Sequence, residues 1–584
     1  MMPEASHPVR HETRSWGLIP QRRWSVLTDA PIFAAGLAAF YSLIVMARYW
    51  SSPFSPHVEL SNNPSALPLY AMYSFLRIAA AYFLSLAFTL VYGYVAAYNP
   101  KAERFMIPLL DILQSIPVLS FLPGVMLAMV ALFPRHQLGI ELGAILLIFT
   151  GQVWNMTFSF YSSLKSIPEE MREAARLYRF SSWQRFTQME LPFAALGLVW
   201  NSMMSVAGGW FFLMACEMFV LGSRDFRLPG LGSYLQTASS AGDTRAILWG
   251  LFAMIAVIVL LDQLVWRPVI AWAQKFKFEQ VESSEAPRSP ILTLLRKSHL
   301  LHLVSHRVTR PLGERTGLYF AKRSYGPKSS RVAGKSRVWT LRVVGVAVGL
   351  GILAAVFDAV RLLSGLTAAD LRTLGLGAGA TFLRVSCALV VAVAWTVPVG
   401  VKIGFNPRLA RIAQPLAQIA ASVPATALFP VVLLVLIRIG GGLGIGSIVL
   451  LLLGTQWYVL FNVIAGAMAI PTDLKEATEV FRFTRRERWR RLILPGIFPY
   501  LVTGLVTAAG GAWNASIVAE YFHLKGQTIS TLGLGATISH ATDAGNFRLL
   551  LAATILMAAI VVTVNRTLWR PMYRLAETRF RLEG

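Results

Sequence analysis

The chain has 584 residues, of which 55% are hydrophobic and 14% are charged, and its formal net charge is +25. A soluble protein carries about 25% charged residues, so this composition excludes an ordinary soluble domain. Apolar runs of roughly 20 residues recur, each long enough to cross a bilayer core of about 30 Å. The basic residues lie in short segments between these runs, which favours a membrane topology signal over nucleic-acid binding.

Twelve apolar runs predict an all-α polytopic membrane protein with twelve transmembrane helices. The expected spans are 30–49, 71–97, 106–133, 139–163, 193–221 and 247–271, then 339–363, 377–404, 413–438, 444–468, 496–522 and 548–569. The first run follows several arginines, but Arg48-Tyr49-Trp50 stands where a signal peptide has small residues, so we expect an uncleaved span. The predicted division is an N-terminal segment 1–29, a repeat 30–272, a basic linker 273–338, a second repeat 339–573 and a tail 574–584.

The two halves repeat each other at a constant spacing. Arg77 and Arg384 lie 307 residues apart, and so do Asn99-Pro100 and Asn406-Pro407. After Gly151 and Gly454 the spacing is 303 residues, as for the Gly-Leu-Gly sequences that begin at Gly230 and Gly533. These matches establish an internal duplication. Because each repeat has an even number of predicted spans, the copies are expected to be parallel repeats, related by a pseudo-two-fold axis along the membrane normal.

Lysine and arginine set the predicted orientation. They gather in the linker, in the tail and in the segments 165–185 and 475–491, whereas 50–70 has none. The positive-inside rule then places both termini, the linker and these segments in the cytoplasm of a bacterial inner-membrane protein. The linker is expected to join the halves flexibly, with a helix near Ile291 lying on the membrane surface. Contact with anionic lipid is favoured over a regulatory domain.

A charged segment occurs at the same place in each repeat, at 166–192 and 469–495. Pro168 and Pro471 suit the first turn of a short helix. Ser181 with Gln184, and Thr484 with Glu487, form the sequence pattern of a capping box and predict the start of a second helix. The Leu-Pro pairs that follow are expected to stop that helix. The sequence therefore predicts a helix–turn–helix that stands off the membrane.

This segment resembles the EAA-type coupling loop of binding-protein-dependent ABC importer permeases, in particular the nitrate, sulfonate, taurine and bicarbonate branch and its duplicated, fused permeases of anion transporters. The resemblance implies the type I importer permease fold and alternating-access uptake of a small anion. It also implies two copies of a separate ABC ATPase, docked at the two loops, and a substrate-binding protein outside the cell. The residues that correspond to the family's ATPase-coupling motif are Glu173, Ala174, Ala175, Arg179, Leu191 and Pro192, and Glu476, Ala477, Thr478, Arg482, Leu494 and Pro495.

The chain departs from that family pattern in two ways. Arg179 and Arg482 stand where the family usually has glycine, and Thr478 replaces the second alanine of the motif. A left-handed arginine costs about 1 kcal/mol, so either the turn is built differently or the groove that receives it has another shape.

No nucleotide site is expected in this chain, which is predicted not to be an enzyme and to hold no cofactor, metal or catalytic residue. The Gly334-Lys335-Ser336 sequence has Ser329 where a phosphate-binding loop needs glycine. ATP and magnesium are therefore expected in the partner ATPase. Cys216 and Cys387 lie in apolar runs, and small buried thiols are the favoured interpretation.

Ten residues are candidates for the substrate pathway, because they are polar, bulky or helix-breaking at membrane depth. They are Ser115, Pro117, Pro123, Trp210 and Glu217 in the first repeat, and Ser422, Pro424, Pro430, Trp513 and Glu520 in the second. For the prolines, a merely kinked helix is the alternative to pathway lining. The two glutamates are interpreted as structural more readily than as pathway residues, with Arg77 and Arg384 as candidate partners.

Two other classes of protein remain as alternatives. An ion-gradient-driven secondary transporter with two six-helix halves should carry several ionisable residues at mid-membrane, and this chain has few beyond Glu217 and Glu520. A membrane enzyme should carry a constellation of histidine, aspartate or cysteine, and no such cluster is repeated in the sequence.

Overall fold

The computed structural model describes residues 22–53, 60–221, 224–276, 289–325, 335–440, 442–524 and 527–579. Within these ranges, nine helices are long and apolar enough to cross a membrane, or ten if one bent pair counts as a single span. The predicted all-helical polytopic fold is therefore present. The count of twelve spans stays a prediction.

The long helices of the two repeats follow the duplicated order of the sequence. In the first repeat they are α1 Arg22–Ser51, α2 Leu67–Tyr98, α5 Leu138–Lys165, α8 Leu191–Glu217 and α10 Thr244–Leu261. In the second they are α15 Lys335–Leu363, α16 Ala368–Phe405, α19 Leu443–Ala469, α22 Leu494–Ala519 and α24 Phe547–Val564. Shorter helices follow them: α9 Leu231–Ala241 and α11 Arg267–Ala273, then α23 Leu534–Asp543 and α25 Arg570–Arg579.

The expected spans 106–133 and 413–438 are each divided near the middle, at Pro117 and Pro424. The first consists of α3 Pro100–Ser115, a 3₁₀ turn η2 Val118–Phe121 and α4 Leu122–Leu132, and the second of α17 Pro407–Ser422 and α18 Ala425–Arg438. The two arms of the first pair meet at 84°. Ile116 and Val423 are extended because the residue before a proline disfavours helical backbone, so each helix ends there.

These broken helices make many of the contacts between the repeats. In the second repeat, α18 packs against α8 and α10 of the first. In the first repeat, η2 packs against α22 and α3 packs against α24. Because α8 corresponds to α22 and η2 to the start of α18, the α18–α8 and η2–α22 contacts are reciprocal, as a pseudo-two-fold relation requires.

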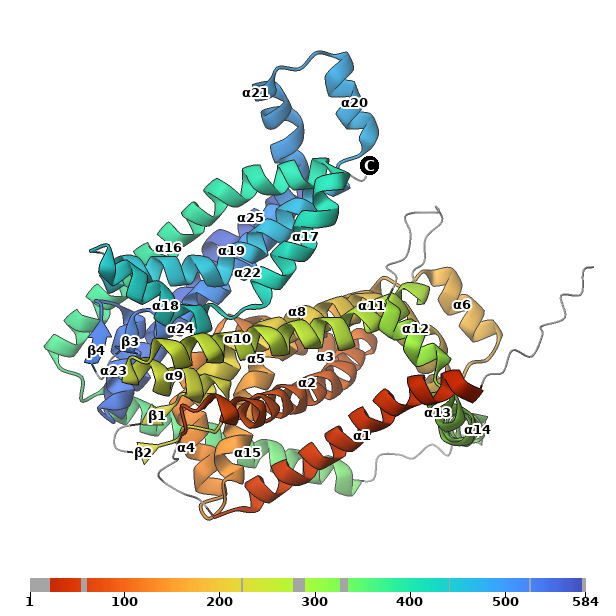
Figure 1. Cartoon of the computed structure of the whole chain (residues 1–584), viewed down its shortest axis with the longest axis horizontal. Helices are drawn as coiled ribbons and strands as arrows, with labels where there is room; N and C mark the ends of the chain where they lie inside the picture. The colour runs from red at the N-terminus through yellow and green to blue at the C-terminus, as the bar shows by residue number, and fades with distance from the viewer. Residues whose placement is uncertain are drawn as a thin grey trace, which may run out of the picture.

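Figure 1 shows the two bundles joined at the end that carries α9, α18 and α23 and splayed apart at the other end. The splayed ends carry the charged segments, with α6 on one bundle and α20 and α21 on the other. A two-residue hairpin, β1 Val220–Leu221 with β2 Arg224–Asp225, follows α8 at the joined end. The longer antiparallel hairpin β3 Tyr521–Leu524 with β4 Gln527–Ser530 follows α22.

The described part of the linker, 289–325, is helical, and α12 lies where the sequence predicts a helix near Ile291. It contains α12 Pro290–Lys297, α13 His299–Val304 and α14 Arg310–Tyr325. The hydroxyl of Ser298 donates to Asp29 Oδ1 of α1 over 2.7 Å, and α12 also packs against α11. The helix α14 packs against the charged segment of the first repeat. The linker is thus built onto the first repeat.

Candidate functional site

Each charged segment forms the helix–turn–helix that the sequence predicts. In the first repeat it is α6 Glu169–Leu177 followed by α7 Ser182–Arg185, and in the second α20 Thr472–Val480 followed by α21 Arg485–Arg488. Both capping boxes are formed: Ser181 with Gln184, and Thr484 with Glu487, each satisfy the other's backbone N–H. We call these two units coupling loop 1 (166–192) and coupling loop 2 (469–495), after the loop of the importer permeases that their sequences resemble.

The turn inside each coupling loop is left-handed at an arginine. Arg179 and Arg482 both have φ of 50°, and within the described residues they alone have positive φ without being glycine. In coupling loop 1, the N–H of Phe180 donates to Ala175 O and the N–H of Arg179 donates to Arg176 O. Phe483 and Arg482 repeat both bonds in coupling loop 2. These two bonds define a Schellman turn, whose left-handed position is usually occupied by glycine. The turn has the geometry that glycine would give it, and the backbone of the arginine is therefore strained.

The expected stop at the Leu-Pro pairs is wrong. From Ser182 to Glu217 and from Arg485 to Ala519 the chain is helical throughout. One wider π-turn lies just before each pair, Phe186–Glu190 and Trp489–Ile493. A proline lacks an N–H and clashes with the carbonyl one turn earlier, and the wider turn accommodates it without ending the helix. The coupling loops are therefore rigidly continuous with α8 and α22.

The tip of each coupling loop exposes side chains that the sequence analysis did not single out. Leu177 and Tyr178 are 81% and 73% exposed, and their counterparts Val480 and Phe481 are 78% and 74% exposed. Glu173, Ala174 and Glu476 are exposed beside them, whereas Ala175 and Thr478 are buried in the packing of α6 and α20. The sequence signal that could have identified these side chains is the occurrence, in both repeats, of large apolar residues at the end of a polar helix. Such a paired apolar surface, rimmed by charge, is typical of a protein-binding face.

The coupling loops are attached to their bundles differently. In loop 1, the buried Glu190 carboxylate accepts from Tyr98 OH over 2.6 Å and pairs with Arg185 Nε at 2.7 Å. In loop 2 the corresponding position is Ile493. Arg488 lies over the ring of Phe405, as Arg185 lies over Tyr98 in loop 1, and Lys475 is a second cation over Phe405. Residues 166–192 contain four acidic and four basic side chains, and residues 469–495 contain four acidic and seven basic ones. The two loops therefore differ in charge.

At the other end of α8 and α22, the candidate residues Glu217 and Glu520 form ion pairs with arginines of neighbouring helices. Arg77 Nη1 lies 2.8 Å from Glu217 Oε1, and Arg384 Nη1 lies 2.9 Å from Glu520 Oε1. Both carboxylates are fully buried. Arg77 and Arg384, which the sequence offers as candidate partners, are the cations that neutralise them.

Each carboxylate also binds the Gly-Leu-Gly turn that begins the next short helix. Glu217 accepts from the N–H of Gly232 over 2.7 Å, and Glu520 accepts from Gly535 over 2.9 Å. A Cβ atom at Gly230 or Gly533 would collide with the carboxyl group, which explains the glycine at both places. The two glutamates thus tie α8 to α9 and α22 to α23.

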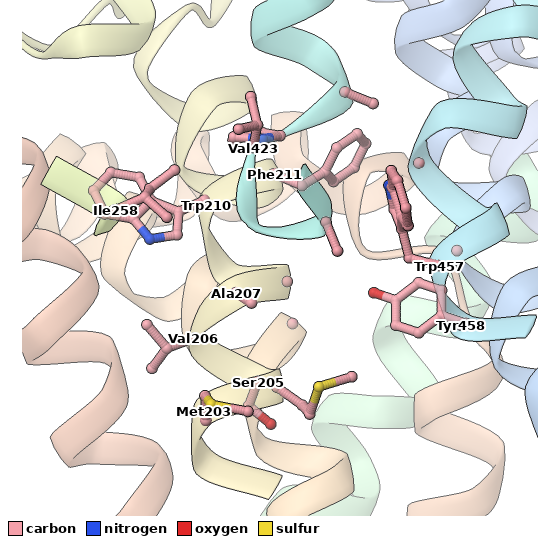
Figure 2. Close-up of a pocket in the computed structure, with 18 of the residues that line it drawn as sticks. Met203, Ser205, Val206, Ala207, Trp210, Phe211, Ile258, Val423, Trp457 and Tyr458 are labelled. Carbon is pink, nitrogen blue, oxygen red and sulfur yellow. The ribbon is translucent and has the colours of Figure 1, made fainter. Parts of the chain in front are cut away.

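Two cavities lie between the repeats. The central cavity has a volume of about 170 Å³ and is lined by α5, α8, α10 and the π-turn Asp262–Trp266 of the first repeat and by α17, α18, α19 and α22 of the second. The second cavity, of about 420 Å³, lies at the joined end beside β1 and β3. Figure 2 shows the central cavity with Trp210, Phe211, Trp457 and Tyr458 around it.

The pathway candidates divide among these places. Trp210 and Pro424 line the central cavity, and Pro123 and Pro430 line the second. Among the residues described as lining either cavity, Pro117, Glu217, Trp513 and Glu520 do not occur. Pro117 instead begins η2, and Trp513 lies 6.5 Å from the ring of Phe382. The side chains of Ser115 and Ser422 lie outside the described part of the structure.

The apolar helices, the duplication and the cavities between the halves define a membrane permease. Residues 89–265 and 396–581 match the family described as "binding-protein-dependent transport system inner membrane component". The chain belongs to this family and carries its domain twice. It is therefore a multi-pass inner-membrane protein and a permease of the ABC transporter class.

Individual relatives match about one repeat's length. The chain is 26% identical to a putative ABC transporter permease protein of Methanocaldococcus jannaschii over 33% of this chain and 72% of that protein. It is 27% identical to the nitrate import permease protein of Synechococcus elongatus, over 28% of this chain and 54% of that protein. It is 29% identical to the taurine transport system permease protein of Escherichia coli, over 31% of this chain and 61% of that protein. The matches to the nitrate and taurine permeases thus span less than two thirds of those relatives.

The buried arginines give a first prediction. Arg77 is fully buried between Glu217 and Glu141, whereas the Arg384 side chain is 14% exposed and Gly444 stands at the place of Glu141. Arg77→Met leaves two carboxylates buried without their cation and should cost about 3–5 kcal/mol. Arg384→Met should cost less. The measurement is the thermal unfolding midpoint of each purified variant. Equal midpoints for the two variants would contradict the expectation that Arg77 contributes more to stability than Arg384.

The strained turns give a second prediction. Arg179→Gly and Arg482→Gly should relieve about 1 kcal/mol of backbone strain each. The amides of Phe180 and Phe483, which close the turns, should then exchange roughly fivefold more slowly in hydrogen–deuterium exchange. The control is Arg176→Gly within α6, where glycine weakens the helix and exchange should become faster. Unchanged or faster exchange in Arg179→Gly would show that the turn is unstrained.

Proposed function

We propose that this chain is the transmembrane permease subunit of an ATP-driven importer, with two permease halves fused in one polypeptide. Each coupling loop docks one copy of a separate ABC ATPase, which supplies ATP and magnesium. The observation that carries the proposal is the pair of equivalent helix–turn–helices, each with an exposed apolar tip and each continuous with a helix that reaches the central cavity.

The coupling mechanism follows from that continuity. The α8 helix runs from coupling loop 1 at Leu191 to Met203–Phe212 in the cavity wall, and α22 likewise runs from loop 2 to Gly511–Ala515. At 1.5 Å per residue, Trp210 lies about 28 Å along α8 from Leu191. When two ATPases close on nucleotide, they draw the loops together. The helices then rock about their joined ends, and access to the cavity passes from one side to the other.

The splay of the bundles supports this direction of movement. In Figure 1 the ends that carry the coupling loops are apart and the opposite ends are in contact. If the loops face the cytoplasm with both termini, as the basic residues favour, the conformation is open inward. An extracytoplasmic binding protein would then release substrate at the joined end, beside the second cavity.

Gly334 lies outside the described residues, and Lys335 and Ser336 begin α15. A phosphate-binding loop needs a glycine-rich turn between a strand and a helix. In this chain Ser329 stands where the first glycine of that turn would be. We therefore assign nucleotide hydrolysis to the partner, and this chain acts as a permease subunit without a cofactor of its own.

The substrate class is proposed from the relatives, which include permeases named for nitrate, bicarbonate and taurine. The import of a small anionic or zwitterionic solute is consistent with all three names. The basic linker faces the membrane surface and contacts anionic lipid, and its helix α14 makes the surroundings of coupling loop 1 unlike those of loop 2.

Charge reversal at the loops tests the docking proposal. Glu173→Lys together with Glu476→Lys places the opposite charge on the exposed face of both loops and should abolish co-purification of the ATPase, with loss of uptake. The matched control is Glu314→Lys on α14, an exposed acidic residue outside both loops. If the double variant retains the ATPase and transports normally, the coupling loops do not dock it.

A further inference from the structure

The two repeats contribute different side chains to the central cavity, although they derive from one duplicated sequence. Asn155 and Tyr458 occupy equivalent places in the two repeats, and so do Phe211 and Asn514, because each pair is 303 residues apart. All four line the cavity. Each repeat thus contributes one amide and one ring, but at exchanged positions.

Aromatic side chains make up much of the cavity wall. Trp210, Phe211 and Phe212 come from α8, and Trp457, Tyr458 and Phe461 from α19. Figure 2 shows the ring of Phe211 beside Trp457, with Tyr458 directing its hydroxyl toward Ala207. The faces of these rings are electron-rich, so they suit apolar or aromatic groups and do not attract an anion.

The charges around the cavity do not suit an inorganic anion either. Among the described residues that line it there is no lysine, arginine or histidine, and the one ionisable carboxylate is Asp262. Asp262 Oδ2 lies 3.3 Å from Arg267 Nε, so its charge is already compensated outside the wall. A small, strongly hydrated anion would lose its water here without gaining a cation.

Two residues that line the cavity also carry a buried polar atom without a hydrogen-bond partner. Ser205 is 3% exposed, lines the cavity, and its hydroxyl has no hydrogen-bond partner in the structure. The amide oxygen of Asn514 is likewise buried without a partner, although its nitrogen donates to Gly510 O over 3.1 Å. Buried polar groups are normally paired, so these two indicate where a ligand supplies hydrogen bonds.

We propose that the central cavity binds the body of an organic solute, and that the transported substrate carries an aromatic or compact apolar body rather than being an inorganic oxyanion. The inference rests on the importer function proposed above. The rings hold the body, and Ser205 with the amides of Asn155 and Asn514 orients one polar group. The volume of about 170 Å³ is sufficient, since a cavity of about 150 Å³ accommodates benzene.

The experiment compares three probes on the full chain in lipid nanodiscs by isothermal titration calorimetry. Benzenesulfonate and methanesulfonate share the charged head and differ in the body, and nitrate has no body. Benzenesulfonate should bind at least tenfold more tightly than the other two. Equal or tighter binding of methanesulfonate or nitrate would overturn the proposal, and so would the absence of binding by all three.

Two variants place the binding in this cavity. Phe211→Asn introduces the residue that the second repeat already carries at this position, and it should weaken benzenesulfonate binding about tenfold. Phe211→Leu keeps an apolar side chain and should weaken it about threefold. Phe252→Leu, on the exposed side of α10, should leave binding within twofold of the original protein. Unchanged affinity in Phe211→Asn would place the ligand elsewhere and overturn the proposal.

The same preparations are tested for co-purification of the ATPase, which separates two kinds of failure. Intact docking without preferential benzenesulfonate binding rejects only the substrate class. Loss of docking in the unmodified chain rejects the importer function on which the inference rests.

Discussion

A carboxylate buried among membrane helices has to be neutralised, and this requirement organises both repeats. Glu217 and Glu520 end α8 and α22 and bind an arginine of α2 or α16 and the backbone N–H groups that begin α9 or α23. Three elements of each repeat therefore meet at one ion pair. The same two helices begin at the coupling loops, about 39 Å away for a helix of 27 residues. Each helix is fixed at its C-terminal end by this ion pair, and its N-terminal end carries the loop that a partner can move.

The duplication has kept this arrangement while letting its surroundings change. Glu141 adds a second carboxylate to Arg77 in the first repeat, and glycine occupies the corresponding place in the second. Glu190 anchors coupling loop 1 by an ion pair, whereas loop 2 is anchored by cations over Phe405. The linker helix α14 packs on loop 1. Fusing two halves in one chain allows each to specialise, because a symmetric dimer would carry every change twice.

Much of this could be predicted from the sequence. The spacing of 307 and 303 residues revealed the repeats, and the capping residues Ser181 and Thr484 placed the second helix of each coupling loop correctly. Local backbone signals failed where a wider context decided the outcome. Pro192 was expected to end a helix, but a π-turn accommodates it, and the break before Pro117 became a sharp bend because η2 packs into the other repeat. The left-handed Arg179 was recognised as a departure, but its conformation depends on a turn that composition does not reveal. Trp210 and Pro424, which were expected near a pathway, line the central cavity, but its full wall could not be predicted, since it comes from residues hundreds of positions apart.

The central claim is that one chain presents two docking sites for a separate ATPase. The most direct test is the stoichiometry of the intact complex, measured by native mass spectrometry after purification in detergent. Two docking sites on one chain predict a mass equal to one copy of this chain plus two copies of the ATPase, with or without a binding protein. A complex that holds a single ATPase, or two copies of this chain for each pair of ATPases, would contradict it.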